Sequence, residues 1–165
     1  MNFTEVPSGT AVFVDANIFI YAFAPDPHLG AACVQLLKRI EKADLLGFTS
    51  SHVLSSVAHR LMSIEACKTF GWPFAGVGRR LKQRTSDVQQ LKRFGEAIDL
   101  IADMKVQVWP VAFRHVTMAV AVSQKLGLLS NDALIVALMN ENSVSYIASN
   151  DGDFDRVSEL IRVVP

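Results

Sequence analysis

The sequence has few cysteines, no excess charge of either sign and no long hydrophobic run. Cys33 and Cys67 are its two cysteines, and they lie far apart without a CxxC or Cys/His spacing. They are expected to be reduced core thiols, which excludes a disulfide framework and a zinc site. Sixteen basic and sixteen acidic residues cancel. A general electrostatic attraction to nucleic acid is therefore excluded, and any phosphate binding has to be local.

Targeting and membrane signals are also missing from the sequence. The first ten residues, MNFTEVPSGT, form a polar leader without the basic start and apolar stretch of a secretory signal. The most apolar stretch, Ala11 to Ala24, is too short to span a membrane and carries Asp15 and Asn17. We expect a cytoplasmic protein that has no membrane partner.

Half of the 165 residues are hydrophobic, which excludes intrinsic disorder. The length suits a single domain over residues 1–165, with no linker. Hydrophobic spacing predicts strands that alternate with helices, and hence an α/β domain with a mainly parallel sheet. The strands are predicted at residues 11–14, 47–51, 106–111, 145–149 and 161–165. The helices are predicted at residues 28–45, 53–67, 87–104 (capped by Ser86), 112–127, 131–142 (capped by Ser130) and 153–160.

Three aspartates lie at the ends of predicted core elements. Asp15 directly follows the first strand, Asp151 follows the strand at 145–149, and Asp132 lies in the first turn of a helix. Ligands of parallel sheets bind beyond the carboxyl ends of the strands, so the three could converge there. Taken singly, Asp132 could serve only the helix dipole and Asp151 only a turn. Asp15 is harder to explain that way, because a carboxylate beside a buried strand needs a partner.

Converging carboxylates repel one another unless a cation binds between them. A set of hard oxygen ligands without histidine or thiolate favours Mg²⁺ or Mn²⁺ over zinc. Such an ion activates water and neutralises charge on a phosphoryl group. Metal-assisted phosphodiester hydrolysis is the reaction class that these residues indicate.

Four blocks of the sequence resemble those of PIN-domain ribonucleases, and the VapC toxins of type II toxin–antitoxin pairs are the nearest likeness. The blocks are FVDANIFIY (13–21), TSSHVLSSVAHRLM (49–62), LLSNDALIVALM (128–139) and IASNDGDF (147–154). The resemblance implies a three-layer α/β/α sandwich and a metal-dependent endoribonuclease. It also implies a homodimer and a neutralising antitoxin, which inserts a segment near the acidic pocket.

The resemblance assigns roles to individual residues. Asp15, Asp132 and Asp151 match the family's metal-site aspartates, and Asp153 matches a frequent additional one. The supporting positions match Asn17 and Ser149.

One family position departs from the pattern. The helix after the second strand carries a glutamate in the family, and Ser56 stands at the matching position here. Neither neighbouring residue supplies a carboxylate, and Glu65 lies more than two turns further along. Two explanations compete: a naturally weakened or inactive protein, and a substitution that disarms a toxic nuclease. Either way, we expect weakened metal binding.

A local cluster of positive charge is the candidate surface for RNA phosphates, although a solvated helix face is the slightly better explanation of each residue taken singly. Only Asp87 opposes this cluster, whose members are Arg79, Arg80, Lys82, Arg84, Lys92 and Arg93. His52, Ser56 and His59 share a helix face, where His59 or Arg60 could touch substrate. A structural histidine at the edge of the core explains His59 at least as well. Trp72 and Trp109 are expected to pack in the protein rather than stack on bases.

Two other functions compete with the nuclease. A catalytically silent PIN module that binds RNA or a protein would explain the missing glutamate. A phosphotransferase of the haloacid dehalogenase type also begins with a strand that ends in aspartate. That chemistry requires a second acid where Asn17 stands, and a lysine near the later strand. No lysine lies between Asn131 and Asp151, so this alternative is disfavoured.

Overall fold

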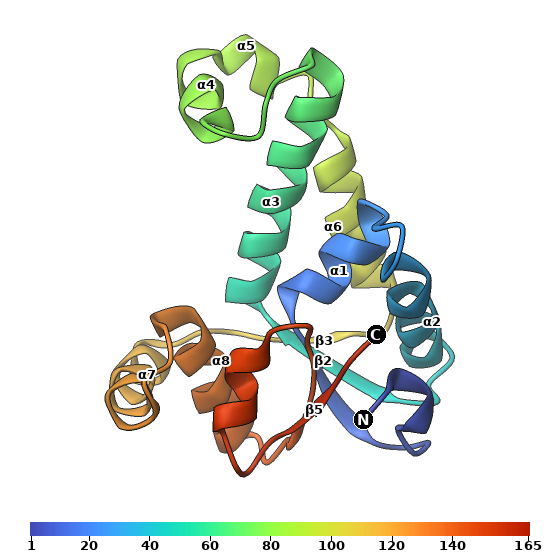
Figure 1. Ribbon diagram of the computed structural model, residues 1–165, viewed down its shortest axis with the longest axis vertical. Coiled ribbons are helices and arrows are strands. Elements are labelled where there is room, and N and C mark those ends of the chain that lie inside the picture. The colour runs from blue at the N-terminus through green and yellow to red at the C-terminus, as the bar shows by residue number, and fades with distance from the viewer.

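Five parallel strands form one sheet in the computed structural model, which describes residues Met1–Pro165 (Figure 1). Their order across the sheet is β3-β2-β1-β4-β5. The strands are β1 (Ala11–Val14), β2 (Leu46–Ser50), β3 (Gln107–Trp109), β4 (Tyr146–Ala148) and β5 (Ile161–Val163). The chain therefore moves outward from β1 to β3 and then returns to the other side of β1. This reversal between β1 and β4 is a topological switch point, where parallel sheets leave a crevice at the carboxyl edge.

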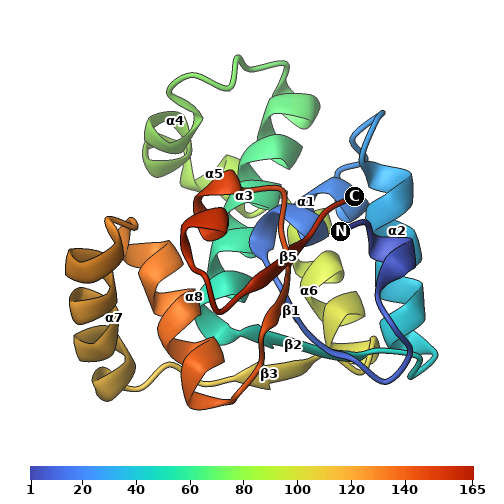
Figure 2. The ribbon, with the colours of Figure 1, turned by 60° about the horizontal axis from the view of Figure 1, so that its bottom comes forward.

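Helices cover both faces of the sheet, which confirms the α/β sandwich expected from the sequence (Figure 2). One face carries α1 (Ala16–Phe23), α2 (Gly30–Glu41), α3 (Ser51–Phe70) and α6 (Arg93–Asp103), and the other carries α7 (Phe113–Leu126) and α8 (Ser130–Glu141). Two short helices, α4 (Val77–Gln83) and α5 (Thr85–Val88), lie at the far end of α3 (Figure 1). No helix is both long and apolar enough to cross a membrane.

The central strand forms the middle of the core because both its neighbours and both helical layers cover it. Val12, Phe13 and Val14 are fully buried, as is Ile147 on the adjoining β4. Such continuous burial explains why the sequence of β1 is apolar at every position instead of alternating. The buried strand therefore fixes the position of the residue that follows it, Asp15.

The N-terminal segment is not the polar leader expected from its composition. It forms a 3₁₀ turn, η1 (Phe3–Glu5), in which Phe3 is buried, and Val6 is buried just after it. The Phe3 amide donates to the Val164 carbonyl at 3.1 Å. Two apolar residues in a polar stretch are therefore enough to fix this segment onto the core.

The single helix predicted at 87–104 is wrong, because the chain breaks between α5 and α6. The Glu65 carboxylate of α3 accepts hydrogen bonds from the backbone amides of Lys92, Arg93 and Phe94, at 2.9–3.1 Å. A carboxylate stabilises the exposed amides and the positive dipole at a helix start. It thereby fixes the beginning of α6, and Ser86 caps nothing there.

Smaller differences concern helix ends. Ser130 is the first residue of α8 rather than its cap, which is Leu129. The helix predicted at 53–67 begins earlier, at Ser51, because the Ser50 hydroxyl accepts from the Val53 amide at 3.2 Å. The predicted helix at 153–160 is only a 3₁₀ turn, η2 (Gly152–Arg156).

Candidate acidic site at the carboxyl edge of the sheet

The structure brings Asp15, Asp132 and Asp151 to the wall of one cavity of about 250 Å³. Asp15 follows β1 and Asp151 follows β4, so both lie at the switch point. Asp132 reaches the cavity from the first turn of α8. The cavity is completed by Ala16, Asn17, Ile20, His52, Val53, Ser56, Asn131 and Ile135.

Asp15 is held rigidly by a set of hydrogen bonds. Its Oδ1 accepts from the Ala16 amide at 2.6 Å, so the carboxylate also caps α1. Its Oδ2 accepts from Asn17 Nδ2 at 2.6 Å and from Ser149 Oγ at 2.7 Å. Asn17 Oδ1 in turn accepts from the Asn150 amide at 3.2 Å, which ties the ends of β1 and β4 together. The two residues predicted to support the site, Asn17 and Ser149, thus both orient Asp15.

Burial raises the pKa of Asp15 above its ordinary value. The hydrogen bonds from Ser149 and Ala16 act in the opposite direction, because they stabilise the charged form. The nearby charge of Asp151 raises the pKa further. An anionic Asp15 therefore carries an electrostatic cost that a bound cation would relieve.

The pKa of Asp132 is raised as well. Its pKa is raised to about 6, first by burial and then by repulsion from Asp151, Asp15 and Asp153. The four aspartates thus interact electrostatically at one site. Such a concentration of negative charge with perturbed protonation is typical of functional sites rather than of solvated surface acids.

Asp151, which caps η2, and Asp153, which lies within it, are placed differently. Asp151 lines the cavity, and its Oδ1 accepts from the Asp153 amide at 2.9 Å. Asp153 itself is not part of the cavity wall, and its carboxylate pairs with Arg156 at 3.1 Å. The position of Asp153 therefore supports a role as a metal ligand less well than the positions of Asp15, Asp132 and Asp151 do.

Ser56, the residue expected at the family's glutamate position, lines the cavity, but its hydroxyl is turned toward its own helix. Ser56 Oγ donates to the His52 carbonyl one turn earlier, at 3.2 Å. His52, which we did not single out as a ligand from the sequence, lines the same cavity, and its buried Nε2 has no hydrogen-bond partner. Glu65 cannot replace the missing acid, because both its oxygens cap α6.

The chemical type of the donors in this cavity suits a hard divalent cation, but the distances between them do not. As the side chains lie, no three His, Cys, Asp or Glu residues approach closely enough to hold a metal ion. Carboxylate oxygens on one wall nevertheless match Mg²⁺ or Mn²⁺, which keep part of their water shell. His52, which also lines the cavity, has a buried Nε2 without a hydrogen-bond partner, and such atoms are rare.

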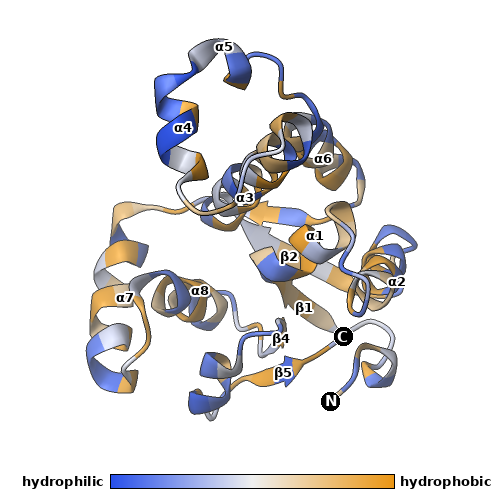
Figure 3. Ribbon diagram, turned by 45° about the horizontal axis from the view of Figure 1, so that its top comes forward, coloured by the Kyte–Doolittle hydropathy of each residue, from blue (hydrophilic) through white to orange (hydrophobic).

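The basic cluster lies away from the acidic cavity, around α4 and the start of α6 at the far end of α3 (Figure 3). From Ser56 to the end of α3 the helix rises by about 21 Å. Arg80 donates to the carbonyls of Pro73 and Ala75, and Arg84 lies over the Trp72 ring, so both have structural roles. Arg79 and Lys82 are exposed and make no hydrogen bond or ion pair.

Both tryptophans pack within the protein, as expected. Trp109 stacks on Phe48 with ring centroids 4.9 Å apart, and Trp72 lies 4.8 Å from Phe70. Neither ring contributes to the acidic cavity.

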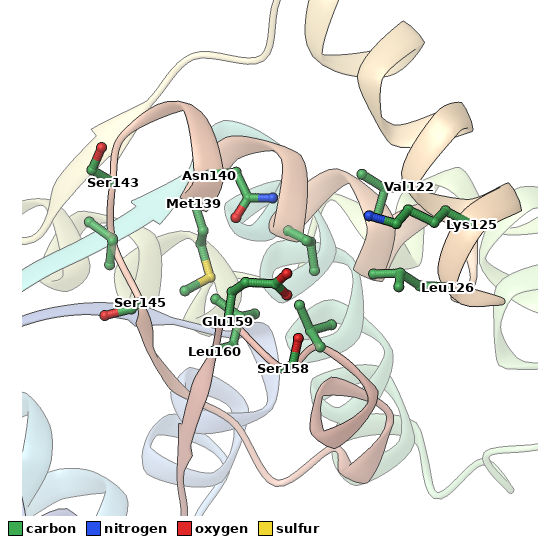
Figure 4. Close-up of a pocket in the computed structure, with 13 residues that line it drawn as sticks. Val122, Lys125, Leu126, Met139, Asn140, Ser143, Ser145, Ser158, Glu159 and Leu160 are labelled. Carbon is green, nitrogen blue, oxygen red and sulfur yellow. The ribbon is translucent and has the colours of Figure 1, made fainter.

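A larger cavity, of about 600 Å³, lies between α7, α8 and the segment before β5 (Figure 4). Its floor is mostly apolar, and Lys125 and Glu159 are its only charged residues. It lacks a group of convergent acids, so it does not compete with the acidic cavity as the catalytic site.

The protein is an α/β/α sandwich whose parallel sheet has aspartates gathered at its switch point. The PIN domain family matches residues 12–160, and the chain belongs to that family. No curated protein sequence matches it.

Two solved structures show the same fold at low sequence identity. VapBC2 from Rickettsia felis, bound to a DNA fragment from its promoter, has a chain that is 16% identical, with a TM-score of 0.58. The match covers 94% of this chain and 98% of that one. VapC20 from Mycobacterium tuberculosis, a toxin that cleaves the sarcin–ricin loop, is 17% identical with a TM-score of 0.56, over 89% and 95% of the two chains.

Replacing Asp132 with Asn is expected to stabilise the metal-free protein near neutral pH. The folded state holds the Asp132 proton up to a pKa of about 6, whereas the unfolded chain releases it near 3.8. Ionisation of Asp132 therefore costs folding free energy that grows as the pH rises between these values. Because the group is partly exposed, we expect the Asn variant to gain about 1 kcal/mol at pH 7.5.

Urea unfolding at several pH values in the presence of a chelator measures this gain. The advantage should shrink as the pH falls toward 4, where the wild-type carboxyl is protonated as well. Asp99→Asn, at an exposed position of α6, is the matched control and should show no such trend. Equal stability of the Asp132→Asn and wild-type proteins at pH 7.5 would mean that neither burial nor the neighbouring aspartates disfavour the charged form of Asp132.

Proposed function

We propose that this protein is a Mg²⁺- or Mn²⁺-dependent endoribonuclease of the VapC toxin type. The observation that carries the proposal is the meeting of Asp15, Asp132 and Asp151 on one cavity at the switch point of a PIN-domain fold. The fold likeness to VapC20, which cleaves the sarcin–ricin loop, supports RNA as the substrate.

In this proposal the three cavity aspartates hold the cation, and Asp153 supports them from outside the wall. When bound, the cation lowers the pKa of a water molecule and neutralises charge on the scissile phosphate. Asn17 and Ser149 keep Asp15 in a single orientation, so its oxygens need no reorganisation on binding. Arg79 and Lys82, two of the unpaired cations of the basic cluster, contact phosphates remote from the cleaved bond.

A catalytically silent PIN module that binds RNA or protein is the second candidate. The observation that favours it is Ser56, which supplies no charge and whose hydroxyl faces its own helix. In that case the cavity would bind a cation weakly and the protein would act by occupancy alone.

We also propose a cognate antitoxin and a second copy of this chain as partners. The resemblance to VapC toxins and the fold likeness to a VapBC2 chain support the antitoxin. An exposed apolar stripe on α7 supports a protein partner: Phe113, Val116 and Val120 are 82%, 46% and 54% exposed. Their spacing places them on one side of the helix, where another chain could cover them.

Incubation of the purified protein with structured and single-stranded RNA, with and without Mn²⁺, tests the nuclease. We expect cleavage that depends on Mn²⁺ and stops when a chelator removes the ion. Cleavage that persists in the chelator would indicate a contaminating or metal-independent nuclease. RNA binding without cleavage would favour the silent module.

A further inference from the structure

His52, which lines the acidic cavity, carries the one fully buried side-chain nitrogen or oxygen of the protein that has no hydrogen-bond partner. Its Nε2 is buried and makes no hydrogen bond, while Asp15 in the same wall has a donor on each oxygen. Buried polar atoms without a partner are rare in native proteins, and a bound ion or water molecule is one of the causes that explain them. A neutral imidazole nitrogen with a free lone pair is a metal ligand.

The position of His52 on α3 connects it with the missing glutamate. His52 lies one helical turn before Ser56, on the same face of the helix and nearer to the sheet. Both side chains line the cavity together with Asp15, Asp132 and Asp151. Ser56 brings no charge to that wall, and the next possible metal ligand along the same helix face is His52.

We propose that His52 Nε2 ligates the cation of this site in place of the absent glutamate. The proposal rests on the nuclease site put forward above and adds a specificity to it. Three carboxylates and one neutral nitrogen form a mixed donor set with one negative charge fewer than four carboxylates. Imidazole binds Mn²⁺ and Co²⁺ better than Mg²⁺, which prefers oxygen. The protein should therefore select transition-metal ions over Mg²⁺.

Pulsed electron paramagnetic resonance of the Mn²⁺-loaded protein tests the ligand directly. We expect a nitrogen coupling that changes from ¹⁴N to ¹⁵N when the histidines are isotopically labelled. The coupling should be lost in His52→Gln and retained in His59→Gln, the matched control on the next turns of the same helix. By calorimetry, His52→Gln should weaken Mn²⁺ binding about tenfold and change Mg²⁺ binding by less than about threefold.

The outcomes separate this ligand from the nuclease site itself. Mn²⁺ that binds in an Asp15-dependent way but shows no nitrogen coupling would overturn the role of His52 and leave the site intact. Mn²⁺ binding that is unchanged in Asp15→Asn, or no Mn²⁺ binding at millimolar concentration, would overturn both the role of His52 and the proposed nuclease site. The isotope measurement on the wild-type chain needs no variant, so a failure of His52→Gln to fold does not affect it.

Discussion

Asp15→Asn is expected to reduce Mn²⁺-dependent RNA cleavage by at least about a thousandfold, equivalent to roughly 4 kcal/mol of transition-state stabilisation. Asp15 is the most buried acid of the cavity, with 9% of its surface exposed, and three hydrogen bonds fix its orientation. Asparagine keeps the shape but removes the charge that would hold the cation. The loss should therefore appear in metal affinity as well as in the cleavage rate.

The same substitution should leave the fold largely intact, which makes the loss of activity interpretable. The Asn carbonyl oxygen can still accept from the Ala16 amide, as Asp15 Oδ1 does. Its amide group would face Asn17 Nδ2, another donor, at a cost of about 1 kcal/mol. Removing a buried charge whose pKa is raised offsets part of that cost.

Cleavage rates and Mn²⁺ isotherms of the wild type, Asp15→Asn and the exposed-site variant Asp99→Asn provide the measurement. The control should match the wild type in both. Cleavage by Asp15→Asn within tenfold of the wild type would show that the reaction takes place elsewhere.

The sequence was sufficient to predict the sheet and the convergence of its acids because both follow from local rules. An apolar run buried on both sides predicts β1, and the strand-end rule places Asp15 and Asp151 at one edge. The fold confirms the parallel α/β arrangement, and the cavity contains the three predicted aspartates.

The features that sequence reasoning missed depend on contacts between distant residues. Helix α1 was not predicted, because the residues after Asp15 are as apolar as the strand before it. In the structure Asp15 caps this helix. Glu65 is 27 residues from the first amide that it caps, so the break before α6 had no local signal. The sequence alone suggested that Arg80 and Arg84 are available to bind phosphate. In the fold, Arg80 donates to two backbone carbonyls and Arg84 lies over an indole ring.

His52 shows the same limit at the site itself. Its position on the face of α3 that carries Ser56 was evident from helical spacing alone. That its Nε2 is buried and has no partner depends on how α1, α3 and α8 close around the cavity. Packing between elements, rather than any motif, distinguishes a potential ligand from an ordinary core histidine.

Ser56→Glu is expected to strengthen Mn²⁺ binding about tenfold or more and to raise RNA cleavage with it. The new carboxylate would add a fourth acid to the cavity that Asp15, Asp132 and Asp151 line. Glutamate also has a higher helix propensity than serine, and the hydrogen bond from Ser56 to the His52 carbonyl contributes little to α3. Without the ion, a further negative charge should make the protein less stable at neutral pH.

Ser55→Glu is the matched control because it adds the same charge one residue earlier, where the side chain is exposed and outside the acidic cavity. Titration calorimetry should show a gain in Mn²⁺ affinity for Ser56→Glu alone. No gain would mean that Ser56 does not face the cation. A silent wild type that becomes active in Ser56→Glu would identify a nuclease disarmed at this position. Activity in both the wild type and Ser56→Glu would mean that the reaction does not require a carboxylate at position 56.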